Sequence, residues 1–333
     1  MTRRLLKIAR AAAPFALAAL LLWHLSYAVD SREVLRQLSA MHPIFFAVAV
    51  ILMLLSAAIA TLRYQIVLQT LCPDDLVYFF PLMKLNLLTL FSAHFLPFSA
   101  LADAMRAVVS RKLLKIPVGM AVEGVIADRS LAVAGLALSG LLLLPVQIGI
   151  RGQWLLITTQ ATVFGGLLML FASAGFGFGR YASFVRPLAE AVRRFAGHVT
   201  TRRGLSWHLC LAAANTGLFA AMLVLLALSL DLHLSLWIAL AVTPAVYLSQ
   251  VVPIFYAGFG SREVALAALL VPNGILVNSD AVALGLGVGL CNLVASLPGA
   301  IFAWSFVRVS GTKTIPPAPN AHQCRLEQER VQS

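Results

Sequence analysis

Three charged residues lie inside one long apolar segment of this chain. Val118–Gly149 is long enough to cross a bilayer, and it contains Glu123, Asp128 and Arg129. A charge at the centre of a membrane helix costs roughly 2.5–3.5 kcal/mol on insertion scales, so such charges are rare and mark functional sites or ion pairs. At about 1.5 Å per residue, Asp128 is expected ~15 Å beyond Val118, near mid-membrane.

These three charges need partners, and helical geometry separates them. Adjacent side chains point about 100° apart on a helix, so Asp128 and Arg129 are expected to have different partners. Glu123 has no basic residue three or four positions away on its own segment, so it requires a distant partner, water or a proton. The group predicts a headgroup site or a proton relay; the alternative is an interhelical ion pair that fixes the bundle.

A second polar group surrounds a break in the apolar pattern at Pro97. His94 precedes this proline, and Asp103 and Arg106 follow it. Residues three apart share a face of a helix, so Asp103 and Arg106 are expected to pair and to lower each other's insertion cost. One interpretation is that Arg106 receives an anionic lipid headgroup that Asp103 orients. The other is a salt bridge at the inner interface that only sets the topology.

A third group runs from Pro253 to Glu263, in Pro-Ile-Phe-Tyr-Ala-Gly-Phe-Gly-Ser-Arg-Glu. A helix that begins after Gly260 would attract an anion such as phosphate to its free N–H groups. Arg262 would add a bidentate donor, and Glu263 would suit the dipole of the first turn. The alternative is an ordinary capped helix start at an interface. Prolines and glycines that allow chain breaks are the predicted hinges: Pro97, Pro253, Gly258 and Gly260.

The composition indicates a membrane protein. Of 333 residues, 60% are hydrophobic and 11% are charged; the mean hydropathy is +0.90. Several apolar runs reach the ~20 residues that span the hydrocarbon core, whereas the short alternating segments of a β-barrel are absent from the sequence. The predicted fold class is an all-α integral membrane protein, a polytopic helical bundle.

Charge and motif content exclude several other classes. The formal net charge is +12, but the excess lies at the N-terminus and in short loops, where topology and anionic lipid headgroups account for it. No interleaved aromatic and basic pattern predicts nucleic-acid binding. No P-loop, nucleophile elbow, dinucleotide fingerprint or metal-ligand spacing occurs, so we expect no cofactor, no metal and no covalent catalysis. The cysteines are scattered: Cys72, Cys210, Cys291 and Cys324.

The predicted bundle has about six full spans and two re-entrant or broken helices. The broken helices are Val77–Leu96 and Leu236–Gln250. A full crossing by Val77–Leu96 would place the basic cluster after Pro97 outside, against the positive-inside bias. A plain eight-span count is the rival interpretation. The full spans are expected at Ala11–Val29, Pro43–Leu62, Val118–Gly149, Leu155–Phe171, Trp207–Leu230 and Ala281–Phe306.

Flanking segments complete this topology. Ser31 could cap an amphipathic helix over Arg32–Met41 at the outer surface, with Val34, Leu35, Leu38 and Met41 on one face. Arginines crowd residues 180–203, a cytoplasmic marker, and basic residues flank both the first and the last span. Both termini are therefore predicted to be cytoplasmic. Residues 1–310 are expected to form the membrane domain, and residues 311–333 a polar, disordered tail.

The two broken regions resemble each other. Arg106 follows Pro97 by nine residues, and Arg262 follows Pro253 by nine, with small residues between them in both cases. In the predicted topology one region enters from inside and the other from outside. Inverted repeats of interrupted helices are a recurring transporter design. An inverted repeat is therefore one interpretation, and a chance coincidence of spacing is the other.

Taken in order, the motifs resemble those of a known family. The stretches are Phe91-Ser-Ala-His-Phe-Leu-Pro, Asp103-Ala-Met-Arg106, Ala127-Asp-Arg129, Gly258-Phe-Gly-Ser-Arg-Glu263 and Leu297-Pro-Gly299. Together they look like the flippase-like membrane domain of lysylphosphatidylglycerol synthases. The resemblance extends from about Leu20 to Arg308. The family usually has asparagine near His94 and glycines near Ala100 and Ala102, so the headgroup preference is expected to differ here.

The resemblance implies lipid handling in the bacterial inner membrane. The chain ends soon after the membrane domain, so we expect no soluble aminoacyl-transferase domain and no transfer from tRNA. The leading hypothesis is a translocator for a phospholipid or a lipid-linked sugar, with anionic headgroups as partners and no enzymatic activity. The alternative is a non-transporting scaffold for a separate lipid- or glycan-modifying enzyme. Whether the chain forms a homo-oligomer is left open.

Overall fold

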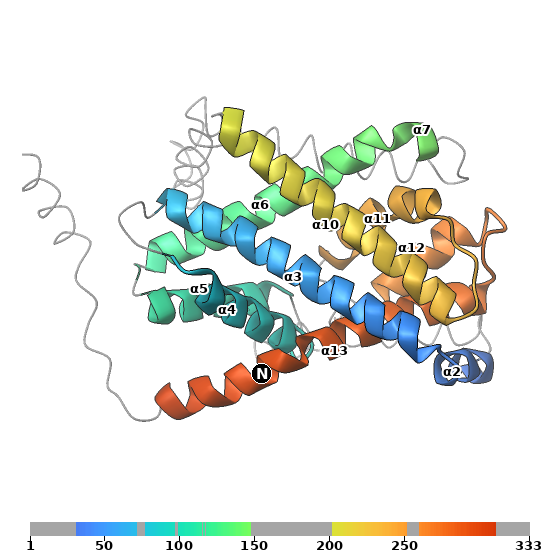
Figure 1. Ribbon diagram of the computed structural model, residues 1–333, viewed down its shortest axis with the longest axis horizontal. Coiled ribbons are helices and arrows are strands. Elements are labelled where there is room, and N and C mark those ends of the chain that lie inside the picture. The colour runs from blue at the N-terminus through green and yellow to red at the C-terminus, as the bar shows by residue number, and fades with distance from the viewer. Residues whose placement is uncertain are drawn as a thin grey trace, which may run out of the picture.

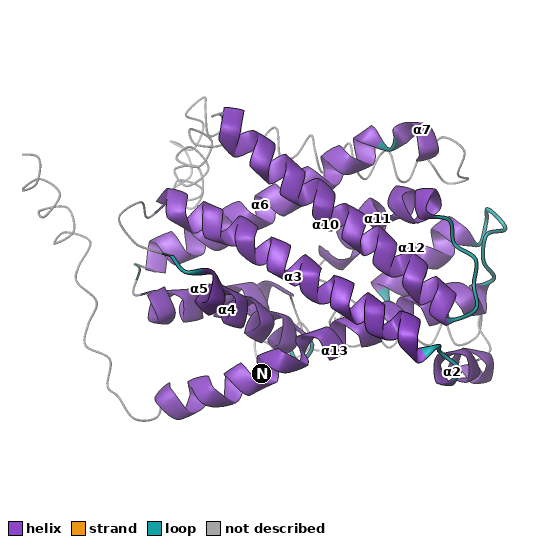
Figure 2. Ribbon diagram, in the orientation of Figure 1, coloured by secondary structure: helices purple, strands orange, loops and turns teal. Residues whose placement is uncertain are grey.

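The computed structural model describes residues 31–71, 77–96, 99–114, 116, 118–147, 202–251 and 260–310. These ranges form helices and loops and contain no strand, which confirms the all-α class (Figure 2). Several sequence predictions lie outside the described residues: the spans Ala11–Val29 and Leu155–Phe171, the arginine-rich stretch, the tail, and the hinges Pro97, Pro253 and Gly258. The helices are α2 (Ser31–Ser39), α3 (Pro43–Leu71), α4 (Phe79–Ala93), α5 (Ser99–Leu114), α6 (Val118–Leu142), α7 (Leu144–Gln147), α10 (Arg202–Ser229), α11 (Leu236–Val251), α12 (Ser261–Leu270) and α13 (Asn278–Ser310).

Four helices in the described ranges are long and apolar enough to cross a membrane. They lie at Pro43–Leu71, Val118–Leu142, Cys210–Ser229 and Asn278–Phe302. Each coincides with one of the full spans expected from hydropathy. The shorter apolar helices, Phe79–Ala93 and Leu236–Gln250, coincide with the two predicted broken helices. A helix of 15 residues rises only ~22 Å, which is less than the ~30 Å hydrocarbon core.

Two predicted boundaries are wrong. The span expected over Val118–Gly149 ends as α6 at Leu142, and a turn at Leu143 separates it from the short α7. The second span was expected to end at Leu62, with Arg63 as its inner flank, but α3 continues to Leu71. The residues beyond Arg63 include no proline or glycine, and the burial of Tyr64, Val67 and Leu68 against neighbouring helices keeps this stretch helical. Arg63 therefore lies within the bundle instead of at its edge.

The first break makes a helical hairpin. Helix α4 ends at Ala93, and His94 is its C-cap residue with turn geometry. Helix α5 begins at Ser99 and packs back against α4. The second break is similar: α11 ends at Val251, and α12 begins at Ser261 and packs against α11. Both breaks thus lie where the sequence pattern predicts them.

The described helices follow the order long, short, short, long twice. Helices α3, α4, α5 and α6 make the first set, and α10, α11, α12 and α13 the second. Equivalent helices make equivalent contacts: α4 packs on α13 as α11 packs on α6, and α5 packs on α6 as α12 packs on α13. Helices α3 and α10 pack side by side along the middle of the bundle (Figure 1).

Contacts along the helices show that the two sets run in opposite directions. The His42 amide, before α3, donates to the Ser229 carbonyl at the end of α10 (2.8 Å), and Ser56 donates to Asn215 further along both helices (2.6 Å). Helices α3 and α10 are therefore antiparallel. Helix α6 begins beside the end of α3, whereas α13 begins beside α2, where Gln37 donates to Asp280 (2.8 Å). This arrangement is the one expected for an inverted repeat.

Two apolar clusters occupy opposite ends of the bundle. One joins α2 and the start of α3 to α10–α13, and the other joins the end of α3 to α4, α5 and the start of α6. In the predicted amphipathic helix, Val34 is buried, and Leu38 and Met41 pack on the first cluster. Leu35 does not share this face, because its side chain is 66% exposed. That part of the prediction is wrong: one residue turns the helix by about 100°.

Glycines permit the closest approaches between helices. At Gly299 on α13, a Cβ atom would collide with the backbone carbonyl of Leu87 on α4. At Gly285, also on α13, it would lie 3.0 Å from the Cα atom of Glu263 on α12. Helix α13 therefore packs closely against both α4 and α12, and these contacts fix the positions of the two helices relative to each other.

Candidate functional site

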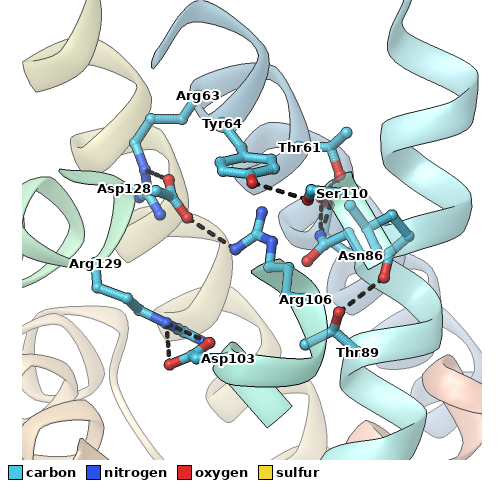
Figure 3. A network of polar contacts seen from close by, with 12 residues as sticks. Thr61, Arg63, Tyr64, Asn86, Thr89, Asp103, Arg106, Ser110, Asp128 and Arg129 are labelled. Carbon is cyan, nitrogen blue, oxygen red and sulfur yellow. Dashed lines mark hydrogen bonds and ion pairs between the residues drawn. The ribbon is translucent and has the colours of Figure 1, made fainter. Parts of the chain in front are cut away.

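Three charged side chains meet in the interior of the bundle. Arg63 donates from Nε to Oδ1 of Asp128 (2.8 Å), and Arg106 donates from Nη1 to Oδ2 of the same carboxylate (2.9 Å). All three side chains are buried. We call Arg63, Arg106 and Asp128 the interior cluster (Figure 3). Its formal charge is two positive and one negative, or +1.

Three helices position the interior cluster. Arg63 comes from the last third of α3, Arg106 from the middle of α5, and Asp128 from α6, about 15 Å from the start of that helix. The guanidinium of Arg106 stacks on the ring of Tyr64, with its carbon 3.9 Å from the ring centre. Tyr64 in turn shares a hydrogen bond with Ser110 on α5 (3.0 Å). The tyrosine therefore fixes the plane of the Arg106 guanidinium.

A second ion pair lies next to the interior cluster. Arg129 binds Asp103 in bidentate fashion, from Nε to both carboxylate oxygens (2.9 and 3.0 Å) and from Nη2 to Oδ1 (2.6 Å). The Arg129 side chain is 52% exposed, and that of Asp103 is partly exposed. We call Asp103 and Arg129 the surface pair. It connects α5 to α6 and lies beside the interior cluster (Figure 3).

These contacts correct one predicted pairing and confirm another. Asp103 and Arg106 were expected to pair within one helix, but Asp103 binds Arg129 and Arg106 binds Asp128. Both contacts cross from α5 to α6, because α6 presents an acid and a base on neighbouring faces at the same depth. Asp128 and Arg129 accordingly have different partners, as their angular separation on a helix predicts.

Further polar side chains extend from this site into α3, α10 and α11. Tyr247 on α11 lies beside Ser56 and Asn215, which share a hydrogen bond (2.6 Å), and within reach of the charges of Arg63 and Arg129. On the other side, Asn86 of α4 donates to the hydroxyl of Thr61 on α3 (3.1 Å). The polar interior therefore continues across the contact between the two sets of helices.

The second break places another charged pair in the interior. Arg262 and Glu263 open α12, and their side chains are 2% and 1% exposed. Nη2 of Arg262 lies 3.9 Å from Oε1 of Glu263. Nδ1 of His94, at the end of α4, donates a hydrogen bond to the Leu90 carbonyl (2.9 Å), and the charge of Arg262 acts on the His94 ring. The two breaks are therefore electrostatic neighbours.

The helix start predicted after Gly260 is confirmed. Gly260 adopts a φ of +91°, which glycine tolerates and other residues adopt only with strain, and α12 begins at the next residue. The Gly260 amide donates to Oε2 of Glu263 (2.7 Å). The carboxylate of Glu263 thus occupies part of the position that we expected an external anion to take.

Glu123 lies on the same helix as Asp128 and Arg129. It is partly buried on α6, about one and a half turns before Asp128. Arg63 is a member of the site that sequence reasoning missed, because it followed an apolar run and was interpreted as a topological flank. The available signal was the helical, largely apolar stretch that continues from Tyr64 to Leu71.

Comparison with known families agrees with this architecture. Residues 11–299 match the family model described as the lysylphosphatidylglycerol synthase TM region. That range is well over half of the 333 residues. The chain belongs to this family. No curated protein matches the chain at a significant level.

The matched range contains every site residue described above. In this member of the lysylphosphatidylglycerol synthase TM-region family, the range includes the interior cluster, the surface pair and the Arg262–Glu263 pair. The match concerns the membrane region alone. It therefore relates the chain to the lipid-handling part of such proteins.

Proposed function

We propose that this protein is a lipid translocator of the bacterial inner membrane, with both chain termini in the cytoplasm. The headgroup of a phospholipid or a lipid-linked sugar would pass through the polar interior while its acyl chains stay in the bilayer. The observation that supports this most strongly is the interior cluster, a buried group with a formal charge of +1. It comes from α3, α5 and α6, and α3 and α6 are long enough to span a membrane.

An uncompensated positive charge is costly in a membrane interior. A buried ion pair that serves only as a strut is expected to be neutral, since the remaining charge would raise the free energy of the folded state. The surface pair, by contrast, is neutral and partly exposed. A positive site behind a neutral, accessible one is what transient binding of an anionic headgroup requires.

The remaining polar residues extend the proposed path. Asp103 and Arg129 would meet the headgroup first, and Arg106 and Asp128 would hold it in the interior. Beyond them, His94, Arg262 and Glu263 lie at the meeting of the two breaks. Since the sequence contains no ATPase motif, transport would be downhill or driven by a gradient. Glu123, partly buried on the same helix as Asp128, is the candidate for proton coupling.

A second candidate function is a membrane scaffold for a separate lipid- or glycan-modifying enzyme. The observation that favours it is that the interior cluster and the surface pair link helices, as α3 and α5 are linked to α6 through Asp128. In this case the ion pairs would stabilise the bundle, and a substitution would act on folding instead of on transport.

The experiment that separates these functions is lipid translocation in proteoliposomes. Fluorescent anionic, zwitterionic and sugar-linked lipid probes are compared for wild type, Arg262→Ala and Asp128→Asn, each with confirmed fold. A translocator predicts flipping by wild type and its loss in both folded variants. Folded wild-type protein that flips none of the probes would contradict the proposal. Glu123→Gln and a collapsed proton gradient test the coupling step: transport insensitive to both rules it out.

A further inference from the structure

The guanidinium of Arg106 is only partly used by the contacts around it. Nη1 binds Asp128, and one face of the group stacks on Tyr64. Nε and Nη2 are buried, and no hydrogen-bond acceptor among the described residues reaches either atom. The residue as a whole is 3% exposed. Two buried N–H donors without acceptors are costly, because each has lost its hydrogen bonds to water.

The two unused donors form one edge of the guanidinium. Nε and Nη2 point the same way, and this is the fork that binds two oxygens of a carboxylate or a phosphate in parallel. Arg129 uses the same Nε–Nη2 edge to bind Asp103. The Arg129–Asp103 contact therefore shows how this edge binds two oxygens. The same edge of Arg106 contacts no acceptor among the described residues.

The charge of the site limits which oxyanion fits. Arg63 and Arg106 contribute +2 and Asp128 contributes −1, which leaves +1. One monoanion neutralises the site; a dianion would reverse its charge. A phosphodiester carries one negative charge on two equivalent non-bridging oxygens. It therefore matches both the charge and the fork.

We propose that the Nε–Nη2 edge of Arg106 binds the phosphodiester monoanion of the substrate. This inference rests on the proposed function for its ligand and specifies the chemical class: a lipid with a single phosphodiester, such as a phospholipid, instead of a diphosphate-linked one. Asp128 stays on Nη1 and Tyr64 on the guanidinium face, so both orient the arginine without competing for the edge. Arg63 balances the charge of Asp128.

The test measures binding to the purified full-length chain in detergent by titration calorimetry. The probes are dihexanoyl phosphatidylglycerol, the phosphate-free dihexanoylglycerol, and water-soluble glycerol 3-phosphate. The variant is Arg106→Lys, which keeps the positive charge but lacks the fork. The matched control is Arg36→Lys on α2, an exposed arginine outside the site that pairs with Glu33.

We expect wild type to bind the phospholipid saturably and to bind dihexanoylglycerol far more weakly. Arg106→Lys should weaken phospholipid binding roughly 10- to 100-fold, since two charge-assisted hydrogen bonds are lost. Arg36→Lys should bind like wild type. Equal affinities of wild type and folded Arg106→Lys would overturn the inference. Equal affinities of wild type for the phospholipid and for dihexanoylglycerol would also overturn the inference. This comparison needs no variant, so it tests the inference even if Arg106→Lys fails to fold.

The binding and flipping measurements together also distinguish a failure of this inference from a failure of the proposed function. Glycerol 3-phosphate is a monoester that is mostly dianionic at neutral pH, so it should bind more weakly than the phospholipid. Binding as tightly as the phospholipid would overturn the assignment to a phosphodiester monoanion. Phosphodiester binding that depends on Arg106, without flipping in proteoliposomes, would support the site and contradict the translocator. Flipping that Arg106→Lys leaves unchanged would support the translocator and contradict the site.

Discussion

Asp128 neutralises only one of the two guanidinium groups that it contacts. The charge left in the interior therefore depends on which residue is changed. Without Asp128 the cluster has a formal charge of +2, and without Arg63 it is neutral. Removing one partner of a buried ion pair leaves an uncompensated charge, which is the costly event in such substitutions.

We predict that Asp128→Asn destabilises the protein more than Arg63→Met. The first variant should lose about 3–5 kcal/mol of unfolding free energy, because it leaves two unneutralised arginines. The second should lose less, because it removes the excess charge and keeps the Arg106–Asp128 pair. The measurement is the free energy of unfolding in mixed micelles. Equal losses in the two variants would show that charge imbalance does not dominate at this site.

The surface pair allows a test by exchange of its members. Arg129→Asp alone places two acids opposite each other on α5 and α6 and should lower both stability and transport. Adding Asp103→Arg restores an ion pair with reversed polarity. We predict that the double variant regains stability but not lipid flipping, because the arginine then sits on α5. Recovery of both stability and lipid flipping would indicate that the surface pair only links α5 to α6, as the scaffold hypothesis proposes.

At the scale of the helix, close contacts at glycines determine where the broken helices α4 and α12 pack against α13. Gly299 on α13 lies directly against the backbone of Leu87 on α4, and Gly285 lies against Glu263 on α12. A helix can approach another this closely only where Cβ atoms are missing. Helix α13 thus sets the position of both breaks relative to each other.

We predict that Gly299→Ala destabilises the protein by about 1–3 kcal/mol, because the added methyl group forces α13 away from α4. The matched control is Gly217→Ala on α10, where a Cβ atom would meet nothing within 4 Å. That variant should be neutral or more stable by up to about 1 kcal/mol, owing to the higher helix propensity of alanine. Both are measured by unfolding in mixed micelles. A Gly299→Ala protein as stable as the control would show that α4 and α13 can separate without cost.

For the molecule as a whole, the antiparallel sets of helices place acidic and basic ends on opposite sides. Asp231 and Asp280 lie at the end where α10 stops and α13 begins. Arg111 and Lys112 lie in the last turn of α5, on the side where α6 begins. The positive-inside bias assigns the basic end to the cytoplasm.

Cysteine labelling tests this assignment. In a protein whose native cysteines are replaced, Asp231→Cys should react with a membrane-impermeant maleimide only in right-side-out vesicles. Lys112→Cys should react only in inverted vesicles. Cysteines that react from the same side would contradict the antiparallel arrangement of the two sets. Reaction of each from the side opposite to that expected would keep the arrangement and reverse the orientation in the membrane.

Much of the fold could be predicted because its signals are local in sequence. Apolar runs of sufficient length predicted the spans at α3, α6, α10 and α13, and the short runs predicted the breaks. Gly260 predicted the start of α12, since positive φ is a local property of glycine. Charges inside or beside apolar segments identified Asp128, Arg106 and Arg262 as buried residues, because a charge in such a segment is costly unless protein surrounds it.

The partners of these charges required the tertiary structure. Arg63 is 65 residues from Asp128, and Arg106 is 22 residues from it. Which residues meet depends on how α3, α5 and α6 are rotated and packed. Residue spacing within one helix carries no information about this packing. The sequence by itself determined the membrane class, the four spans found in the described residues and the two breaks. The tertiary structure determined that Asp128 binds two arginines, that Asp103 binds Arg129, and that one edge of Arg106 remains available, because those contacts form only when separate helices pack.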